Sequence, residues 1–406
     1  SDINIKLTRL FSKQNTISFI FFYGNDHLKY KKNEKDSYFM NPDRVRDDMR
    51  SAWGNWGIGL RWDKMISPNL YMNTVFSYNQ YRASMNKRYR HETSLGDTVQ
   101  LKKIHFKSGQ KEWRMKSDFT YALNHWNRLY FGGHYIYHVY VPEKRITLNK
   151  VKDMEQIFEK QVNYKEYAHD VALYVEDEIA IKEKWTIHPG LRGTLFHVGN
   201  TNYFSLEPRF SMQYNWNTRW AAKASYTLMS LGSSMLNMPT DLWVPVSDEV
   251  KPMKSHQCVL GIYYHPRAQW HFSMEGFYKT QANLVDDYHG MDITPEYLDW
   301  KENVHFGNGR SFGLEWMLQK KGGNTSGWIN YTLSHAYRWF SDGSINQGHH
   351  FPAKYDSRHI LNLVLLHKFS DFFDISATWT FNNGFYTTQP LERYDSPVAL
   401  PGEKGD

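Results

Sequence analysis

Cysteine is almost missing from this chain, and long apolar runs are missing altogether. Cys258 is the only cysteine among 406 residues, so the chain cannot form an internal disulfide and offers no second thiolate for a zinc site. The mean hydropathy is negative. The longest apolar runs, near residues 19–23 and 363–366, fall far short of the roughly 18 residues that a membrane-spanning helix needs. A protein that crosses a membrane with helices is therefore excluded.

Alternation of apolar and polar residues, in contrast, is present along most of the chain. From Arg219 to Met229 every second residue is apolar, and residues 269–279 and 373–381 repeat the pattern. A period of two is that of a β-strand whose two faces meet different surroundings. The polar side carries Lys and Glu, which excludes a dry core there and favours strands with one face on lipid and the other on a lumen.

Aromatic residues make up 17% of the chain, and many lie at the ends of the alternating segments. Such positions are held by Trp113, Tyr121, Trp185, Trp220, Tyr226, Trp328 and Tyr331. Amphipathic rings gather at the two headgroup levels of a membrane. We interpret these rings as two girdles rather than as a stacking platform for bases, so no nucleic-acid partner is expected.

The alternation predicts about sixteen strands of the length that crosses a membrane. They lie near residues 3–10, 16–24, 52–63, 70–82, 110–123, 128–141, 166–182, 185–198, 203–216, 219–231, 256–265, 269–281, 310–321, 326–338, 358–369 and 372–384. Tight connections rich in turn-forming residues join them on one side. On the other side, long polar excursions are predicted near residues 25–51, 83–109, 142–165, 232–255, 282–309 and 339–357.

Three residues sit awkwardly in these predicted strands. Pro189 and Pro208 cannot donate a ladder hydrogen bond, so a bulge is expected near each. Asp177 faces lipid by parity, which predicts either a bulge or a position at the membrane interface.

The predicted fold class is therefore an all-β, transmembrane, antiparallel β-barrel. The connectivity places both ends of the chain on the side of the long connections, whereas a complete outer-membrane barrel starts and finishes on the other side. We therefore expect residues 1–406 to form one outer-membrane β-barrel domain that continues in further strands before Ser1 and after Asp406.

Several short motifs follow one another in a specific order from about residue 166 onward. They are Gly190-Leu-Arg192, Leu206-Glu-Pro-Arg209, Ser225-Tyr226, Leu236 to Pro245 with Lys251-Pro252, Glu275 to Lys279, Gly307-Asn-Gly309 with Gly313-Leu-Glu315, Gly327-Trp328 to Ser334, and Tyr355-Asp-Ser-Arg358-His359. Together they resemble the barrel of TonB-dependent outer-membrane receptors. The resemblance implies a barrel of about 22 strands, of which about sixteen are visible here, and an N-terminal plug domain that this chain lacks.

The resemblance also implies a function: active, TonB-dependent import of a scarce, bulky nutrient across the outer membrane of a Gram-negative bacterium. The cargo classes are siderophores, haem, vitamins, oligosaccharides and peptides, and the sequence favours none. The implied partners are the nutrient ligand, the TonB energy-transducing complex acting through the plug segment, and outer-membrane lipid and lipopolysaccharide. A surface lipoprotein joins them if the cargo is a glycan or a peptide.

The formal net charge of +7 is mild for a chain of this length. A lumen and loops rich in Lys and Arg account for it. The alternative is attraction of an anionic ligand or of lipopolysaccharide, since net charge bears on association rather than on fold.

Candidate ligand-binding residues lie in the long connections. The large aromatics are Trp243, Tyr288, Trp300 and Trp339. Aromatics of this size suit ligand contact, although packing within the loops is the alternative for each. His349 and His350 form a pair of imidazoles that suits haem iron or a divalent metal, and a solvated loop is the simpler interpretation.

Asp356, Arg358 and His359 lie where the last long connection re-enters the wall. We interpret them as a structural hydrogen-bonded cluster, with gating of the lumen as the alternative role.

No enzymatic function, cofactor or resident metal is predicted, because no nucleophile has an ordered histidine and acid beside it. Glu176 and Glu178 share one strand face, and we expect them to bond to Arg192 or Arg209 rather than to act as an acid and base pair. Two other functions remain open for the barrel: a passive porin of sixteen strands, and a structural or adhesive surface barrel.

Overall fold

The computed structural model describes residues 2–35, 44–93, 97–151, 154–158, 165–237, 241–287 and 304–386. Within these ranges the chain forms an 18-stranded antiparallel sheet and a separate two-stranded hairpin. The sheet contains β1 (Asp2–Ser12), β2 (Asn15–Lys35), β3 (Arg44–Ser67), β4 (Leu70–Glu92), β5 (Thr98–Ala122), β6 (Asn127–Val151), β7 (Met154–Phe158), β8 (Glu166–Ile181), β9 (Trp185–Val198), β10 (Thr201–Asn215), β11 (Trp220–Leu231), β14 (Met253–Tyr264), β15 (Trp270–Asp287), β16 (Val304–Lys320), β17 (Thr325–Trp339), β18 (Phe351–Pro352), β19 (His359–Lys368) and β20 (Asp374–Asn382). The hairpin is β12 (Ser233–Asn237) with β13 (Asp241–Pro245), and η2 (Asn346–Gly348) is a 3-10 helix.

The predicted fold class is confirmed. Strands β7 and β18 have five and two residues, and the other strands of the sheet correspond one to one with the predicted segments. None of the helices in the described ranges has the length and apolar character to cross a membrane.

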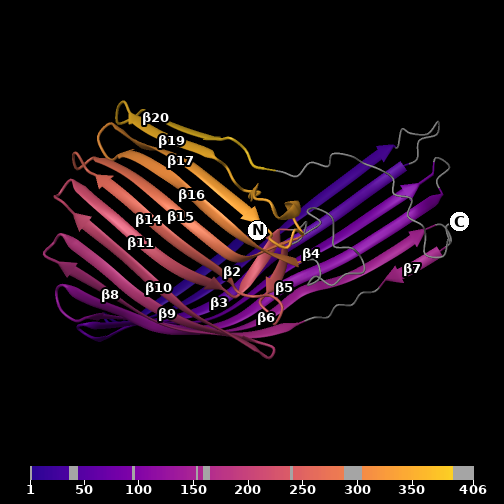
Figure 1. The fold of residues 1–406 in the computed structure, drawn as a ribbon, viewed down its shortest axis with the longest axis horizontal. Coiled ribbons are helices and arrows are strands. Elements are labelled where there is room, and N and C mark those ends of the chain that lie inside the picture. The colour runs from indigo at the N-terminus through magenta and orange to yellow at the C-terminus, as the bar shows by residue number, and fades with distance from the viewer. Residues whose placement is uncertain are drawn as a thin grey trace.

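The sheet is bent into a trough, with its tight connections gathered along one margin (Figure 1). From β1 to β20 the long strands pair with their neighbours in chain order, so the wall follows the sequence. Strands β1 and β20 form the two edges, and no pairing joins them within the described ranges.

Two of the tight connections need a left-handed backbone. Lys182 and Glu183, between β8 and β9, have φ values of 49° and 59°, and Gly322 and Gly323, between β16 and β17, have 73° and 74°. Two successive residues with positive φ are typical of the type I′ turn, whose twist matches that of the flanking strands. Glycine adopts this conformation without strain, which explains the Gly-Gly pair after β16.

The long excursions predicted near 25–51, 83–109, 142–165 and 282–309 are wrong as loops, because their described parts are mostly strand. The β2–β3 ladder, for example, continues without interruption to Lys35 opposite Arg44. The amino-acid composition of these extensions is polar, like that of a loop, because only their inward face carries apolar side chains. That face buries Met85, Ile104 and Phe106, each no more than 6% exposed.

The remaining two long excursions also carry structure. The one near 232–255 contains the hairpin of β12 and β13, and the one near 339–357 contains η2 and β18.

The bulges expected near Pro189 and Pro208 are wrong, since the β9–β10 ladder runs past both without a register shift. Each proline instead faces a gap in the ladder on the other side of its strand. Pairing of β8 with β9 is interrupted between Glu176 and Ile179, where Pro189 would pair. Pairing of β10 with β11 begins only at Arg209, directly after Pro208.

Asp177 lies toward the tight-turn end of β8, where its carboxylate accepts a hydrogen bond of 3.0 Å from the Asn127 side-chain amide. The β6–β8 ladder passes Asp177 without a register shift, so no bulge occurs there, and the interfacial position stays a prediction.

The outward face of the wall carries two aromatic belts. On the side of the long strands, ring centroids of Trp56 and Tyr78 are 5.0 Å apart, those of Tyr78 and Trp113 are 4.9 Å apart, and those of Trp113 and Tyr137 are 5.6 Å apart. We call these four residues the upper belt. At the tight-turn margin Trp185 stacks near Tyr214, and Trp220 near Tyr264.

Between the belts the outward side chains are large, apolar and exposed. Among them are Leu173, Phe204, Leu206, Leu260 and Leu314. An apolar band bounded by two aromatic belts is the outer surface of a lipid-facing barrel wall.

The assignment of faces makes a direct prediction. Ala224, near the middle of β11, lies on the apolar outward face opposite Leu260, and Leu363 of β19 lies on the same face opposite Ile329. A lysine at Ala224 or at Leu363 is expected to lower the free energy of unfolding by about 2–4 kcal/mol, because it places a charge in hydrocarbon. The neighbouring Ser225→Lys, which faces inward, should cost little. Urea unfolding of the full-length protein in lipid vesicles measures all three, and equal costs at Ala224 and Ser225 would contradict this assignment.

Candidate functional site

The inward face of the wall is polar and ion-paired at the height of the apolar outer band. Arg209 of β10 lies 3.2 Å from a Glu176 oxygen of β8 and 3.8 Å from a Glu207 oxygen, and Arg192 of β9 lies 3.7 Å from Glu207. The predicted bond of Glu176 to arginine is confirmed, whereas Glu178 accepts a hydrogen bond from the Tyr130 hydroxyl at 2.8 Å.

This network continues across β5 and β6. The Tyr174 hydroxyl donates to Asp118 at 2.6 Å, Lys116 lies 2.8 Å from the same carboxylate, and His138 lies 3.1 Å from Glu112. Buried charges are tolerated where they are paired, and an apolar core would not need them. The inward face is therefore suited to contact water or a polar occupant, not a hydrophobic one.

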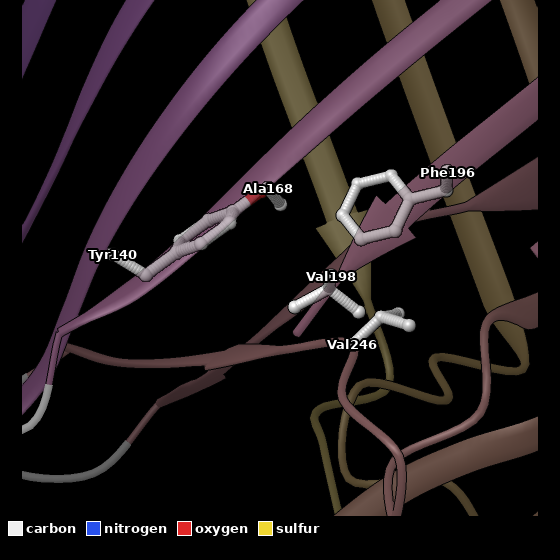
Figure 2. Packing of buried hydrophobic residues seen from close by; sticks show 5 residues of the cluster. All are labelled: Tyr140, Ala168, Phe196, Val198 and Val246. Atoms are coloured by element: carbon white, nitrogen blue, oxygen red, sulfur yellow. The ribbon is translucent and has the colours of Figure 1, made fainter. Parts of the chain in front are cut away.

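The long-strand end of the trough is partly covered from inside. Strand β13 contacts β5 and β6, while β12 contacts β15, so the hairpin reaches from one part of the wall to another. The segment after it, residues 246–252, packs onto the inward face. Val246 belongs to one buried cluster with Tyr140, Ala168, Phe196 and Val198, in which it lies beside Val198, and all five are at most 6% exposed (Figure 2).

Polar contacts hold this covering segment in place. The Tyr203 hydroxyl donates to the Ser247 carbonyl oxygen at 2.6 Å, and the Asn283 side-chain amide donates to the Pro252 carbonyl oxygen at 2.9 Å. Gly232 lies at the base of the segment, where a Cβ would be 2.5 Å from the Phe196 ring. A side chain at this position would push Phe196 out of the apolar cluster.

A cleft opens beside the covering segment. Above Pro208, β10 pairs only with β9, while the end of β11 pairs only with β14, so the two strands separate there. The cleft has a volume of about 160 Å³, and its charged lining consists of Asp170, Arg192, Lys251 and Lys254. With three cations against one carboxylate, it is suited to an anionic or hydrogen-bonding group.

Two of the predicted ligand-contact residues are brought together. The rings of Trp339, at the end of β17, and His350 have centroids 4.6 Å apart. His349 is exposed, and its backbone N–H donates to the Asn346 carbonyl oxygen at 3.0 Å. No group of three His, Cys, Asp or Glu side chains suited to a metal ion occurs in the described part of the chain.

The structure shows no ligand-binding arrangement for the other three predicted aromatics in the part of the chain that it describes. The Trp243 backbone pairs with Met235 inside the hairpin of β12 and β13. Tyr288 and Trp300 lie outside the described residues.

Phe340 anchors the connection that carries the Trp339–His350 pair. It is fully buried, and its ring lies so close to Gly307 of β16 that a Cβ at that glycine would be 2.7 Å from it. Farther along the connection, the Ser344 hydroxyl and N–H donate to Asp342 at 2.7 Å and 3.1 Å, and these bonds lower the pKa of the Asp342 carboxyl.

Asp356, Arg358 and His359 close the same connection against the wall. Asp356 is 2% exposed and accepts a hydrogen bond of 3.0 Å from the Ala336 N–H of β17. The Arg358 carbonyl oxygen accepts from the Ser334 N–H at 3.0 Å, and the His359 ring lies 2.7 Å from the Tyr331 hydroxyl oxygen. The three residues thus fasten the start of β19 to β17 through different partners.

Sequence reasoning missed the covering segment, its Tyr203 bond and the cleft beside it. Pro208 was the available signal, because a proline inside a strand marks a place where one ladder must open. Which neighbour is lost, and what fills the opening, depends on contacts between residues far apart in the chain.

A lipid-facing wall with a polar interior defines the class of outer-membrane β-barrels. The family model described as TonB dependent receptor-like, beta-barrel matches residues 6–402, and the chain belongs to that family. No curated protein sequence matches the chain.

Solved structures with the same fold include transporters and an uptake receptor of low sequence identity. The transporter YddB from Escherichia coli has a TM-score of 0.57 at 10% identity, with 89% of this chain and 53% of that chain covered. The FrpB iron transporter from Neisseria meningitidis has a TM-score of 0.52 at 10% identity, with 93% and 65% covered. The ferric yersiniabactin uptake receptor FyuA from Yersinia pestis has a TM-score of 0.50 at 12% identity, with 94% and 66% covered. The chain thus spans between 53% and 66% of the length of these three proteins.

The Tyr203 bond yields a test of the covering segment. Tyr203→Phe removes the bond to Ser247 and should weaken the segment by about 1 kcal/mol, which corresponds to roughly fivefold faster amide exchange at Val246 and Val250. Hydrogen exchange followed by mass spectrometry on the full-length protein measures this. Tyr214→Phe on the same strand is the control, since no hydrogen bond of the Tyr214 hydroxyl occurs within the described ranges. If exchange is unchanged in Tyr203→Phe, the segment is held by its apolar contacts alone.

Proposed function

We propose that this chain is the barrel wall of a TonB-dependent importer of a scarce, bulky nutrient in the outer membrane of a Gram-negative bacterium. The observation that carries the proposal is the charged inward face behind a lipid-facing outer band, in a chain that belongs to the receptor family. A polar interior suits a lumen that contains water or a polar plug domain, and membership of the receptor family favours the plug.

In this proposal the long-strand end faces the outside of the cell. The covering segment 246–252 and the Trp339–His350 pair stand at the mouth, where cargo would first meet the wall. Trp243, Tyr288, Trp300 and His349 are proposed as further contacts. The buried Asp356 bond and the contacts of Arg358 and His359 are proposed to keep the mouth connection in one position while cargo binds.

The rest of the importer would be supplied by the parts of the protein that this chain does not span. The plug segment is proposed to contact the TonB energy-transducing complex, which draws on the inner-membrane proton gradient. Cargo is proposed to be a siderophore, haem, a vitamin, an oligosaccharide or a peptide, with a surface lipoprotein as partner for the last two. FrpB is named an iron transporter, so ferric chelates are the first class to test.

Uptake by the source bacterium tests the proposal. Deletion of the full-length gene should abolish uptake of one class in a panel of ferric siderophores, haemin, cobalamin, oligosaccharides and peptides, and complementation should restore it. A protonophore should abolish the restored uptake, because the force reaches the barrel through TonB. Uptake that persists with the protonophore indicates a passive porin. Normal uptake of the whole panel in the deletion strain indicates a structural or adhesive barrel.

The Trp339–His350 pair yields a second test. Trp339→Ala should raise the cargo concentration for half-maximal uptake by roughly tenfold, because large aromatics supply much of the binding energy at recognition sites. Trp328→Ala, at the opposite end of the same strand, is the control and should leave that concentration unchanged. An equal effect of the two substitutions would point to loss of wall stability in place of a ligand contact.

A further inference from the structure

The upper belt is joined to an arginine by one buried amide. The Gln80 side-chain oxygen of β4 accepts hydrogen bonds from the Trp56 indole N–H at 3.2 Å, the Tyr78 hydroxyl at 3.4 Å and the Arg82 guanidinium at 3.0 Å. Gln80 is 7% exposed. The polar edges of the belt are therefore turned toward Arg82, at the border between the apolar band and the extensions of β3 to β5.

Past this border the outward face becomes basic. Strand parity and register place a set of cations on the same face as the belt, which we call the basic patch: Arg50, Arg82, Arg88, Lys103 and Lys107. Figure 1 shows β3, β4 and β5 as long arrows. The inward face of the same extensions buries Met85, Ile104 and Phe106 and carries Lys87 and Lys102, so most of the cations lie on the outward side.

Among the residues that the structure describes, the basic patch has no anionic partner. Within the described part of the chain, no carboxylate lies within ion-pair distance of any of its five side chains. Two acids share this face: Glu92, which pairs with Arg46 and Arg90, and Asp48, which lies opposite Arg88 in the ladder without an ion pair. The described acids thus leave the charge of the patch open to an external anion.

An apolar groove lies on the other side of the belt. It has a volume of about 410 Å³ and opens on the outward face of β2 to β6. Its lining includes the apolar side chains of Phe19, Ile58, Leu60, Phe76, Trp113 and Met115. Trp113 belongs to the upper belt, so groove, belt and basic patch follow one another without a gap along the wall.

We propose that this outward face of β3 to β5 is a binding site for a phosphate-bearing lipid of the outer leaflet, of the lipopolysaccharide type. An acyl chain lies in the groove, and the ring edges of the belt meet the headgroup. The phosphates lie against the basic patch, first at Arg82 and Lys107, which are nearest the belt. The order of apolar, amphipathic and cationic surface matches the order of chain, headgroup and phosphate in such a lipid.

The lipid site rests on the membrane orientation given under the proposed function, but it does not require import. A barrel that binds lipid and imports nothing would therefore support the lipid site and contradict the proposed import. Cationic side chains near an anionic lipid surface strengthen binding and lose strength with salt. A lipid held in this way should resist detergent extraction at low salt and be released at high salt.

The test uses the full-length protein, purified in detergent and titrated with lipopolysaccharide in native mass spectrometry. The variant Arg82→Gln with Lys107→Gln should weaken lipopolysaccharide binding by at least about tenfold. The matched control, Lys87→Gln with Lys102→Gln, removes the same charge from the inward face of the same two strands and should change binding by less than about twofold. Retained resistance of each barrel to unfolding in cold detergent verifies folding, and Arg82→Gln alone serves if the double variant does not fold.

Equal losses in the two double variants, or no loss in either, would overturn the proposal. Lipopolysaccharide stripped of its phosphates should bind about as weakly as the patch variant, and full binding of the stripped lipid would reduce the site to its groove. Pyrophosphate that binds as tightly as the lipid would show a site for free anions. Heparin that displaces the lipid and binds more tightly would favour a soluble polyanion instead.

Discussion

Everything in this structure depends on the cross-strand hydrogen-bond ladder. A strand that faces lipid cannot leave N–H and C=O groups unpaired, because hydrocarbon offers no partner for them and each such group costs several kcal/mol. Long antiparallel neighbours satisfy these groups from β1 to β20. The ladder is interrupted at the prolines of β9 and β10. Above Pro208 the covering segment and a cationic cleft lie beside the separated strands, so a local loss of pairing creates the most distinctive part of the inner surface.

The ladder also gives every strand two faces with different side chains. Outward residues form an apolar band with a belt at each margin, and inward residues form paired charges such as Glu176 with Arg209. Along β3 to β5 the same division continues beyond the band but changes character. There the inward face is partly buried and the outward face is cationic, so one regular element presents apolar, amphipathic and cationic surface in turn. The proposed import concerns the inward face of the sheet, and the proposed lipid binding concerns its outward face.

The mouth of the trough is built differently, by connections that fold back onto the wall. Phe340 and Asp356 are buried and fix one connection, while Val246 and the Tyr203 bond fix another. Their energies come from a few contacts each, in contrast to the many bonds of the ladder. Such segments open at lower cost than the wall, which is the property expected of parts that admit cargo.

Period-two alternation and turn residues by themselves determined the all-β class, the sixteen long strands, the two faces and the polar interior, because side-chain parity is a local property of the backbone. The sequence also placed Glu176 beside arginine. It failed for the extensions of β2 to β6, whose polar composition hides an inward apolar row that is recognised only when Met85, Ile104 and Phe106 are seen to be buried together. The pairing of Trp339 with His350, the opening above Pro208 and the cations gathered around Arg82 were decided by tertiary structure, since each joins residues from different strands or connections whose register no local pattern specifies.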